Sequence, residues 1–180
     1  MRKSLILFGF LLMAAGAAKA QEGRGFEVAG TYQYVRINPG AGAPGANCQG
    51  GAGSFAAYLT ARVGVVGDVG FCKITGLPSG TSSSETNFLF GPRAYLAAHG
   101  RVSPYVQALF GGERASASVS GIGSGSTNAF AMAFGGGADI AVSRHVSFRA
   151  IQVDYFYTHF GGASQNNLRL QSGLVWRIGR

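Results

Sequence analysis

Large apolar residues recur at every second position in several stretches of the chain, and the positions between them hold small or polar residues. In 128–141, the residues on one face are Phe130, Met132, Phe134, Ala138 and Ile140, and those on the other are Ala129, Ala131, Ala133, Gly135, Gly137 and Asp139. The segments 25–37 and 166–178 alternate in the same way. A period of two is that of a β-strand, whose side chains point alternately to its two faces. The pattern predicts strands with one bulky apolar face and one small or polar face.

Eight segments carry this signal or a weaker form of it, separated by clusters of glycine, serine, alanine and asparagine, which favour turns. The predicted strands are 25–37, 54–59, 63–73, 87–96, 102–112, 128–141, 146–158 and 166–178. In 146–158 the alternation changes phase, because Val146 and Phe148 face one side while Ile151 and Val153 need the other. A β-bulge near Ala150 would restore one apolar face, and we predict one there.

The predicted connections alternate in length. Long ones cover 38–53, 74–86 and 113–127, with a shorter one at 159–165, whereas brief turns cover 60–62, 97–101 and 142–145. Long loops at one end and tight turns at the other are typical of outer-membrane barrels. The small residues also suit the narrow interior of eight strands, whereas a water-soluble barrel puts its large apolar residues inside. We therefore predict an all-β, eight-stranded, antiparallel, up-and-down transmembrane β-barrel with both termini on the periplasmic side.

The first residues predict an export signal. Arg2 and Lys3 precede an apolar run, and Ala18-Lys19-Ala20 has the small-x-small pattern of a cleavage site. We expect cleavage after Ala20, so that 1–20 is a signal peptide and 21–180 is the barrel domain. Only 12% of the chain is charged, against about 25% in a typical soluble domain, which again favours a membrane barrel.

The formal net charge of +8 includes Arg2, Lys3 and Lys19, so the mature chain carries about +5. The remaining basic residues are scattered, and nucleic-acid binding has no support. Cys48 and Cys72 are the only cysteines. Export to an oxidising compartment permits a disulfide between them, although the sequence equally allows two free thiols. No histidine stands at ligand spacing, so neither a metal site nor a cofactor site is predicted.

Eight charged residues fall on the inward face of the predicted strands: Glu27, Asp68, Arg93, Asp139, Arg149, Asp154, Arg169 and Arg177. A buried charge is costly unless it is paired, and arginine can bind a carboxylate with two hydrogen bonds. We expect Asp139–Arg149, Asp154–Arg169, Asp68–Arg93 and Glu27–Arg177 pairs that fill the lumen. The same residues could instead form an ion path or an acid–base pair.

One cluster resembles a catalytic arrangement only in part. His159 lies at the end of a predicted strand with Ser164 nearby, and an outer-membrane esterase that deacylates lipid A uses a His-x-Ser-Asn pattern facing the bilayer. Here Phe160 and Gly161 follow His159, so the serine is missing from that spacing. Ser164 is expected in a loop. We predict no catalytic residues, and the deacylase-like esterase stays as the least favoured alternative.

The last strand carries a more specific signal. Gln171, Gly173, Trp176 and Ile178 follow a polar-x-Gly-x-x-aromatic-x-hydrophobic pattern. This resembles the β-signal through which the barrel assembly machinery recognises outer-membrane proteins, except that Gly179 and Arg180 stand in place of a terminal phenylalanine. Residues 21–180 resemble the outer-membrane β-barrel domain family that includes the OmpA transmembrane domain, OmpX and opacity-like proteins. The resemblance implies a monomer in the bacterial outer membrane, among outer-membrane lipid and lipopolysaccharide.

The family resemblance does not fix a role, since members of one fold differ in function. We expect a non-enzymatic barrel with a structural, envelope-integrity or surface-interaction role, whose contact surface is formed by 38–53, 74–86 and 113–127. These segments hold few charges or aromatic residues, so a strong hot-spot binder is not expected. A small porin-like channel for ions or small solutes is the main alternative. A soluble lipid-carrier barrel is another, and it predicts recovery in the periplasmic extract.

Overall fold

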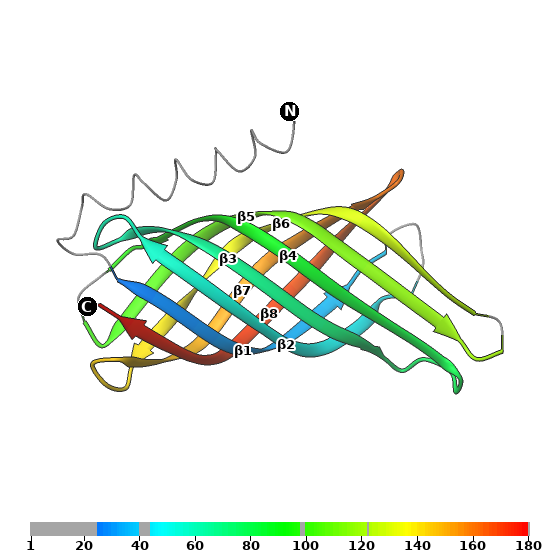
Figure 1. The fold of residues 1–180 in the computed structure, drawn as a ribbon, viewed down its shortest axis with the longest axis horizontal. Coiled ribbons are helices and arrows are strands. Elements are labelled where there is room, and N and C mark those ends of the chain that lie inside the picture. Colours follow the sequence, from blue (N-terminus) through cyan, green and yellow to red (C-terminus); the bar gives the residue numbers. More distant parts are fainter. Residues whose placement is uncertain (1–24, 40–43, 98–99, 122, 180) are drawn as a thin grey trace, which may run out of the picture.

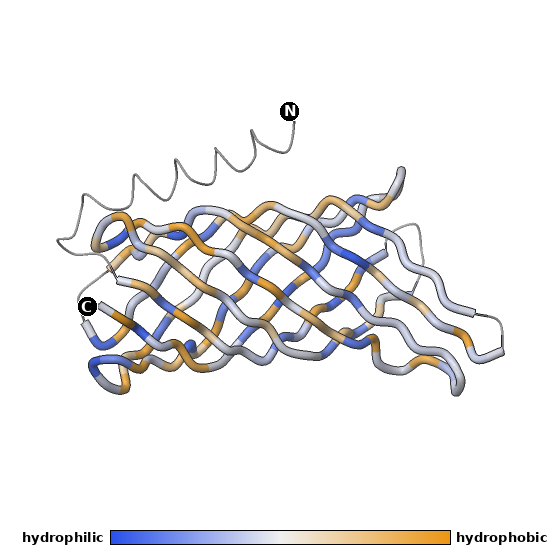
Figure 2. The backbone as a smooth tube through the Cα atoms, viewed as in Figure 1, coloured by the Kyte–Doolittle hydropathy of each residue, from blue (hydrophilic) through white to orange (hydrophobic). Residues whose placement is uncertain are grey.

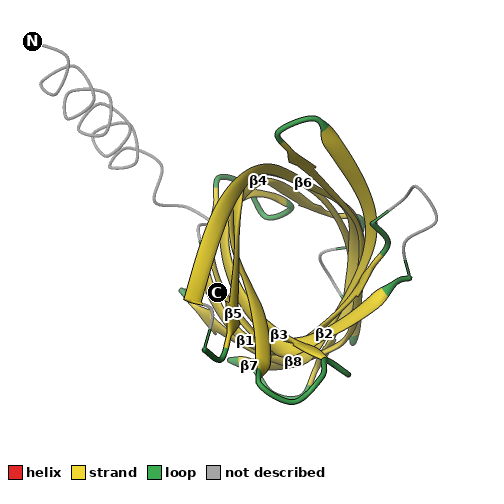
Figure 3. Cartoon of the chain, turned by 90° about the vertical axis from the view of Figure 1, so that its right-hand side faces the viewer, coloured by secondary structure: helices red, strands yellow, loops and turns green. Residues whose placement is uncertain are grey.

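Eight antiparallel strands close into a single barrel in the computed structural model, which describes residues 25–39, 44–97, 100–121 and 123–179 (Figures 1 and 3). The strands are β1 (Phe26–Ile37), β2 (Ala46–Tyr58), β3 (Val63–Thr75), β4 (Thr81–Tyr95), β5 (Val102–Val119), β6 (Gly123–Ala141), β7 (Val146–Phe160) and β8 (Ala163–Ile178). Each strand pairs with the next along the chain, and β8 returns to pair with β1. The predicted fold class is confirmed. The predicted signal peptide, 1–20, lies outside the described residues.

The barrel has two different ends. At the short-turn end, β2–β3, β4–β5 and β6–β7 are joined by tight connections, and the C-terminal end of β8 lies beside the start of β1 (Figure 1). At the long-hairpin end, β4, β5 and β6 extend together as paired strands, with β4 paired to β5 as far as Thr81 and Val119 (Figure 1). Positive φ angles at Gly76, Gly80 and Gly121 lie in the hairpin connections there, where glycine carries no Cβ penalty.

The lengths predicted for several connections were wrong. The ranges 46–53, 81–86, 113–119 and 123–127 are strand throughout, so much of each expected long loop belongs to an extended strand. These segments consist largely of glycine, serine and alanine, and they carry no bulky apolar face. Beyond the apolar band of the barrel nothing requires such a face, and backbone pairing alone continues the sheet. A pattern search based on hydrophobic alternation therefore ends these strands too early.

The apolar face of the barrel points outward, as predicted. Phe130, Phe134 and Trp176 are between 40% and 51% exposed, whereas Ala131 and Ala133 on the opposite face are fully buried. Figure 2 shows apolar and polar residues alternating along the strands. Among the described residues there is no helix with the length and hydropathy needed to cross a membrane. Large apolar side chains outside and small or charged ones inside form the arrangement expected of a barrel surrounded by lipid.

The predicted irregularity in β7 is confirmed. The register between β7 and β8 shifts between Arg149 and Gln152, and the register between β6 and β7 shifts at Ala138/Asp139. The extra residue keeps Phe148 and Ile151 both on the outer face, where they are 41% and 50% exposed. It also turns Arg149 and Gln152 both inward, where each is completely buried.

Candidate functional site: the charged network inside the barrel

All eight charged residues predicted to face the lumen lie on the inner face of the barrel. The side chain of Arg177 is 11% exposed, and the other seven residues are at most 2% exposed. Their positions follow from strand periodicity, because every second residue of a strand in a closed barrel points to the axis. Buried charges in this number require partners, and six ion pairs connect them.

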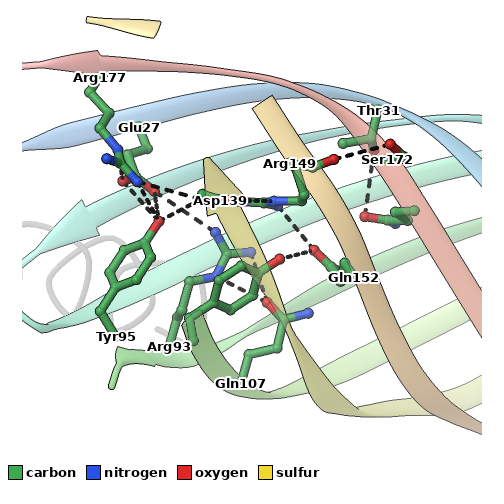
Figure 4. A network of polar contacts seen from close by, with 12 residues as sticks. Glu27, Thr31, Arg93, Tyr95, Gln107, Asp139, Arg149, Gln152, Ser172 and Arg177 are labelled. Carbon is green, nitrogen blue, oxygen red and sulfur yellow. Dashed lines mark hydrogen bonds and ion pairs between the residues drawn. The ribbon is translucent and has the colours of Figure 1, made fainter. Parts of the chain in front are cut away.

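The cluster nearest the short-turn end is built around two carboxylates (Figure 4). Arg177 Nε donates to Glu27 Oε1 at 3.0 Å where β8 closes against β1. Arg149 Nε donates to Asp139 Oδ1 at 2.9 Å across the β6–β7 hairpin. The Tyr95 hydroxyl lies between the carboxylates, 2.7 Å from Asp139 Oδ2 and 3.1 Å from either oxygen of Glu27. The two expected pairs thus belong to one connected cluster.

A second cluster lies closer to the long-hairpin end and centres on Arg169. Its Nη1 is 2.7 Å from Asp68 Oδ1, and its Nη2 is 2.9 Å from Asp154 Oδ2. The expected Asp68–Arg93 pair was wrong. In the β3–β4 register Asp68 lies opposite Leu89, and Arg93 lies opposite Gly64, four residues further along β4. Arg93 instead approaches Glu27 to 4.0 Å.

Two glutamines join these clusters. Gln107 Oε1 accepts hydrogen bonds from Arg93, and its Nε2 donates to Asp154 Oδ1 at 3.0 Å. Gln152 Oε1 accepts from Arg149 Nη1 at 3.0 Å, and its Nε2 donates to Asp154 Oδ2 at 2.8 Å. An amide is suited to this position because its oxygen and its nitrogen can serve a cation and an anion at the same time. The result is one hydrogen-bonded network from Glu27 to Asp68.

Each arginine of the network also stacks over an aromatic ring. Tyr105 lies between two of them, with the guanidinium carbons of Arg93 and Arg149 at 4.5 and 4.9 Å from its ring centroid. Arg169 lies 5.5 Å from the ring of Phe156, and Arg177 lies 5.6 Å from that of Tyr95. A cation over a ring face is attracted by the ring quadrupole, most strongly where water is excluded. These rings fill volume that the ion pairs alone would leave open.

The sequence analysis missed several of these inward residues. Tyr58, Tyr95 and Tyr105 are each 2% exposed, and they have the same strand parity as the small residues around them. Glu85 and Glu113 were placed in loops, yet they lie inside the barrel at 7% and 3% exposure. They stand on neighbouring strands, near the long-hairpin end, and their carboxyl groups interact with each other. Strand parity could have located the tyrosines, but only the true strand lengths reveal the two glutamates.

Cys48 and Cys72 form a disulfide between β2 and β3, with their Cα atoms 5.4 Å apart. They lie in the lumen near the long-hairpin end, fully buried. Glu85 is the third member of this group, with an oxygen within 4.8 Å of the two sulfur atoms. Sulfur atoms that are bonded to each other do not provide the thiolates that a zinc site uses. We therefore interpret Cys48, Cys72 and Glu85 as a structural group rather than as a metal site.

His159 and Ser164 are brought together on the outside of the barrel. Ser164 is the second residue of β8 rather than a loop residue, and it lies opposite His159 across the β7–β8 hairpin. His159 Nδ1 is 3.0 Å from Ser164 Oγ, and the Tyr157 hydroxyl is 2.7 Å from the same oxygen. All six carboxylate residues among the described residues are buried inside the barrel. No carboxylate among the described residues is placed to orient His159. The contact is therefore a Ser–His dyad and not a triad.

Comparison with known proteins agrees with this geometry. Residues 5–177 match the family model described as the outer membrane protein β-barrel domain. The chain belongs to this family. Similar solved structures include Neisserial surface protein A (18% identity, 88% of this chain and 100% of that one, TM-score 0.67). The attachment invasion locus protein Ail of Yersinia pestis is also similar, with 18% identity over 87% of this chain and 99% of that one and a TM-score of 0.61. OprG of Pseudomonas aeruginosa has 11% identity over 88% of this chain and 98% of that one, with a TM-score of 0.54. At these identities the likeness shows the fold. A search of curated proteins gave no match.

Family membership places this protein in the bacterial outer membrane, with its strands crossing the lipid. The four residues that resemble the assembly signal all lie in β8, which pairs with β1 to close the barrel. Trp176 and Ile178 face outward at 45% and 56% exposure. Gln171 faces inward and donates from Nε2 to Gln33 Oε1 at 3.1 Å. Gly173 lies opposite Thr31 in the closing pair.

Proposed function

We propose that this protein is a non-enzymatic, monomeric outer-membrane barrel with a structural or surface-interaction role and a lumen closed to ions. The observation that carries the proposal is the network from Glu27 to Asp68, in which charged groups, glutamine amides and stacked rings fill the lumen. Four cations meet four anions in this network, so its formal charges balance. A network with this many buried ion pairs and hydrogen bonds is suited to stabilising a barrel rather than to forming a pore.

The extended β-hairpins at the long-hairpin end, rather than loops, would form the contact surface at the cell exterior. We also propose that the signal peptide is cleaved after Ala20, and that Gln171, Gly173, Trp176 and Ile178 are recognised by the barrel assembly machinery. The pairing of β8 with β1 supports this assignment, because the last strand must be held in place before the barrel can close.

Planar-bilayer recording tests the closed lumen. We expect the folded protein to give no steady conductance steps, because ions cannot pass the network without breaking buried ion pairs. A Gln107→Ala/Gln152→Ala variant, which removes both bridging amides without changing the charge, is expected to give brief openings. Gln49→Ala, on an outward-facing glutamine, should stay silent. Steady unitary steps from the wild type, under conditions where insertion is verified, would favour the small-porin alternative.

The His159–Ser164 contact favours one second candidate, the hydrolysis of lipid acyl esters at the membrane surface. A Ser–His pair within hydrogen-bond reach is part of what nucleophilic catalysis needs, but a group that orients the histidine is also needed. We expect no release of fatty acid from lipid A by the wild-type protein above the rate of a His159→Ala variant, measured by mass spectrometry of the lipid. Hydrolysis that depends on both His159 and Ser164 would show that this barrel is an esterase.

A further inference from the structure

On the outer surface of the barrel the structure describes basic residues but no acidic ones. All six described carboxylate residues are buried inside, so no described carboxylate residue lies beside the exposed basic residues of the exterior. Arg62, Arg101 and Arg144 lie in the connections of the short-turn end, one in each. Lys73 and Arg114 lie on β3 and β5 near the long-hairpin end, both exposed. The exterior is therefore suited to anionic partners at both rims.

Lys73 and Arg114 differ from the other cations because they belong to an ordered surface. The register places Lys73, Ser84, Ser116 and Ser126 side by side across four strands. The next row toward the middle of the barrel is Phe71, Thr86, Arg114 and Asn128 in the same order. The row beyond the first one holds Ser82, Ser118 and Ser124. All these side chains share the outward face by strand parity.

These rows line a pocket. The pocket is about 380 Å³ in volume, and its lining includes Lys73, Arg114 and the six serines of the two outer rows. Arg114 Nη2 donates to Ser126 Oγ at 2.9 Å, which fixes the guanidinium against the wall of the pocket and leaves its other donors available. Two cations among hydroxyl groups offer charge for an anion and hydrogen bonds for a sugar. That combination is the chemistry that binds a phosphorylated saccharide.

The height of the pocket on the barrel indicates the source of the ligand. Directly below the Arg114 row, the outward residues are Val69, Phe88, Gly112 and Phe130, and Phe88 and Phe130 are more than half exposed. Aromatic residues in such a row lie where acyl chains meet headgroups. Arg114 is two residues beyond that row and Lys73 four, or roughly 7 and 13 Å along the strands. Phosphate groups attached to the sugars of a membrane lipid lie at this level.

We propose that the pocket between Lys73 and Arg114 binds a phosphorylated sugar of lipopolysaccharide in the surrounding leaflet. This rests on the proposed function in one respect, namely that the long-hairpin end faces the cell exterior. Arg114, at the level nearer the lipid, binds the phosphate together with Lys73, and the serine rows bind the sugar hydroxyls. The contact would hold the extended β4–β5–β6 sheet against the leaflet surface.

Equilibrium binding of fluorescent lipopolysaccharide to the mature barrel in phosphatidylcholine nanodiscs tests the site. A Lys73→Gln/Arg114→Gln variant should bind at least about tenfold more weakly than the wild type, the loss expected for charge-assisted hydrogen bonds to one phosphate. The matched control is Arg62→Gln/Arg101→Gln, which removes the same charge from the opposite rim and should bind as the wild type does. Dephosphorylated lipopolysaccharide should show no difference between the wild type and the Lys73/Arg114 variant.

Equal binding by the two double variants would overturn the site. Binding of heparin, but not of lipopolysaccharide, that depends on Lys73 and Arg114 would overturn the lipid as the source and assign the pocket to a soluble polyanion. The orientation is checked separately on intact cells with a membrane-impermeant amine reagent, since Lys73 is the only lysine beyond residue 20. Labelling of Lys73 supports the proposed orientation. Labelling of Lys73 only after the cells are broken would contradict the orientation, whatever the nanodisc measurement gives.

Discussion

Replacing Arg169 with methionine is expected to lower the free energy of unfolding of the barrel by about 3–5 kcal/mol. Arg169 is fully buried and is the ion-pair partner of both Asp68 and Asp154. Methionine occupies a similar volume but leaves two buried carboxylates without their cation. Urea titration of the mature protein in phospholipid vesicles, followed by heat-dependent gel mobility, measures the loss.

A triple variant separates the role of the ion pairs from that of packing. Asp68→Asn/Asp154→Asn/Arg169→Met removes the charges together, and we expect it to recover most of the lost stability, because amides tolerate burial better than unpaired carboxylates. Arg114→Met makes the same substitution at an exposed site and should stay within about 0.5 kcal/mol of the wild type. If the triple variant were as unstable as Arg169→Met, then packing around Phe156, rather than charge, would dominate the contribution of Arg169.

The architecture was predictable because lipid imposes a simple rule on one face of each strand. Phe130, Phe134 and Trp176 were predicted to point outward because most of the residues next to them along the strands are small or polar, and the lipid-facing side of a strand is apolar. The same rule located the bulge in β7, since Phe148 and Ile151 can share a face only if a residue is inserted between them. The inward charges followed from the same parity. Periodicity therefore determines which way a side chain points, independently of the pairing of strands.

The partners of those charges were less predictable, because they depend on register and on the shape of the lumen. Asp139–Arg149 and Asp154–Arg169 lie across hairpins, where the short connection fixes the register, and each pair meets in the structure. Asp68 instead meets Arg169, from a strand that is not its neighbour in the sheet. A contact across the lumen cannot be derived from strand order. Predicting such a contact requires knowledge of the tilt of the strands and of the volumes of the residues that fill the lumen.

The exposed His159–Ser164 contact and the pocket at Lys73 both lie on strand ends that the sequence analysis assigned to loops. Both depend on backbone pairing that continues through residues without a hydrophobic pattern, such as Ser116 and Ser126. Since serine and glycine favour turns in isolation, local propensity placed these residues in loops. Extension of an existing sheet overrides that propensity. Each further pair of residues is added to strands that are already aligned, so no new strand pairing has to be started.

Replacing Gly173 with alanine tests whether this residue acts through the closed barrel or only through the assembly signal that it resembles. A Cβ at Gly173 would lie 2.2 Å from the carbonyl oxygen of Gly30 and 2.6 Å from the Cα of Thr31. Both atoms are backbone, so β1 and β8 would have to separate where the barrel closes. We expect a loss of about 3 kcal/mol, the upper part of the usual range for overpacking.

The matched control lies on the facing strand. Gly30 is paired with Leu174, and a Cβ there would have nothing within 4 Å. Gly30→Ala should be neutral or stabilise the barrel by up to about 1 kcal/mol, since alanine restricts the unfolded chain. Refolding both purified variants into vesicles, without any assembly factor, separates the two roles of Gly173. A defect of Gly173→Ala in this system shows that the strands need the glycine in order to approach each other. Normal refolding in vesicles with failure in cells would mean that the glycine is needed for recognition alone.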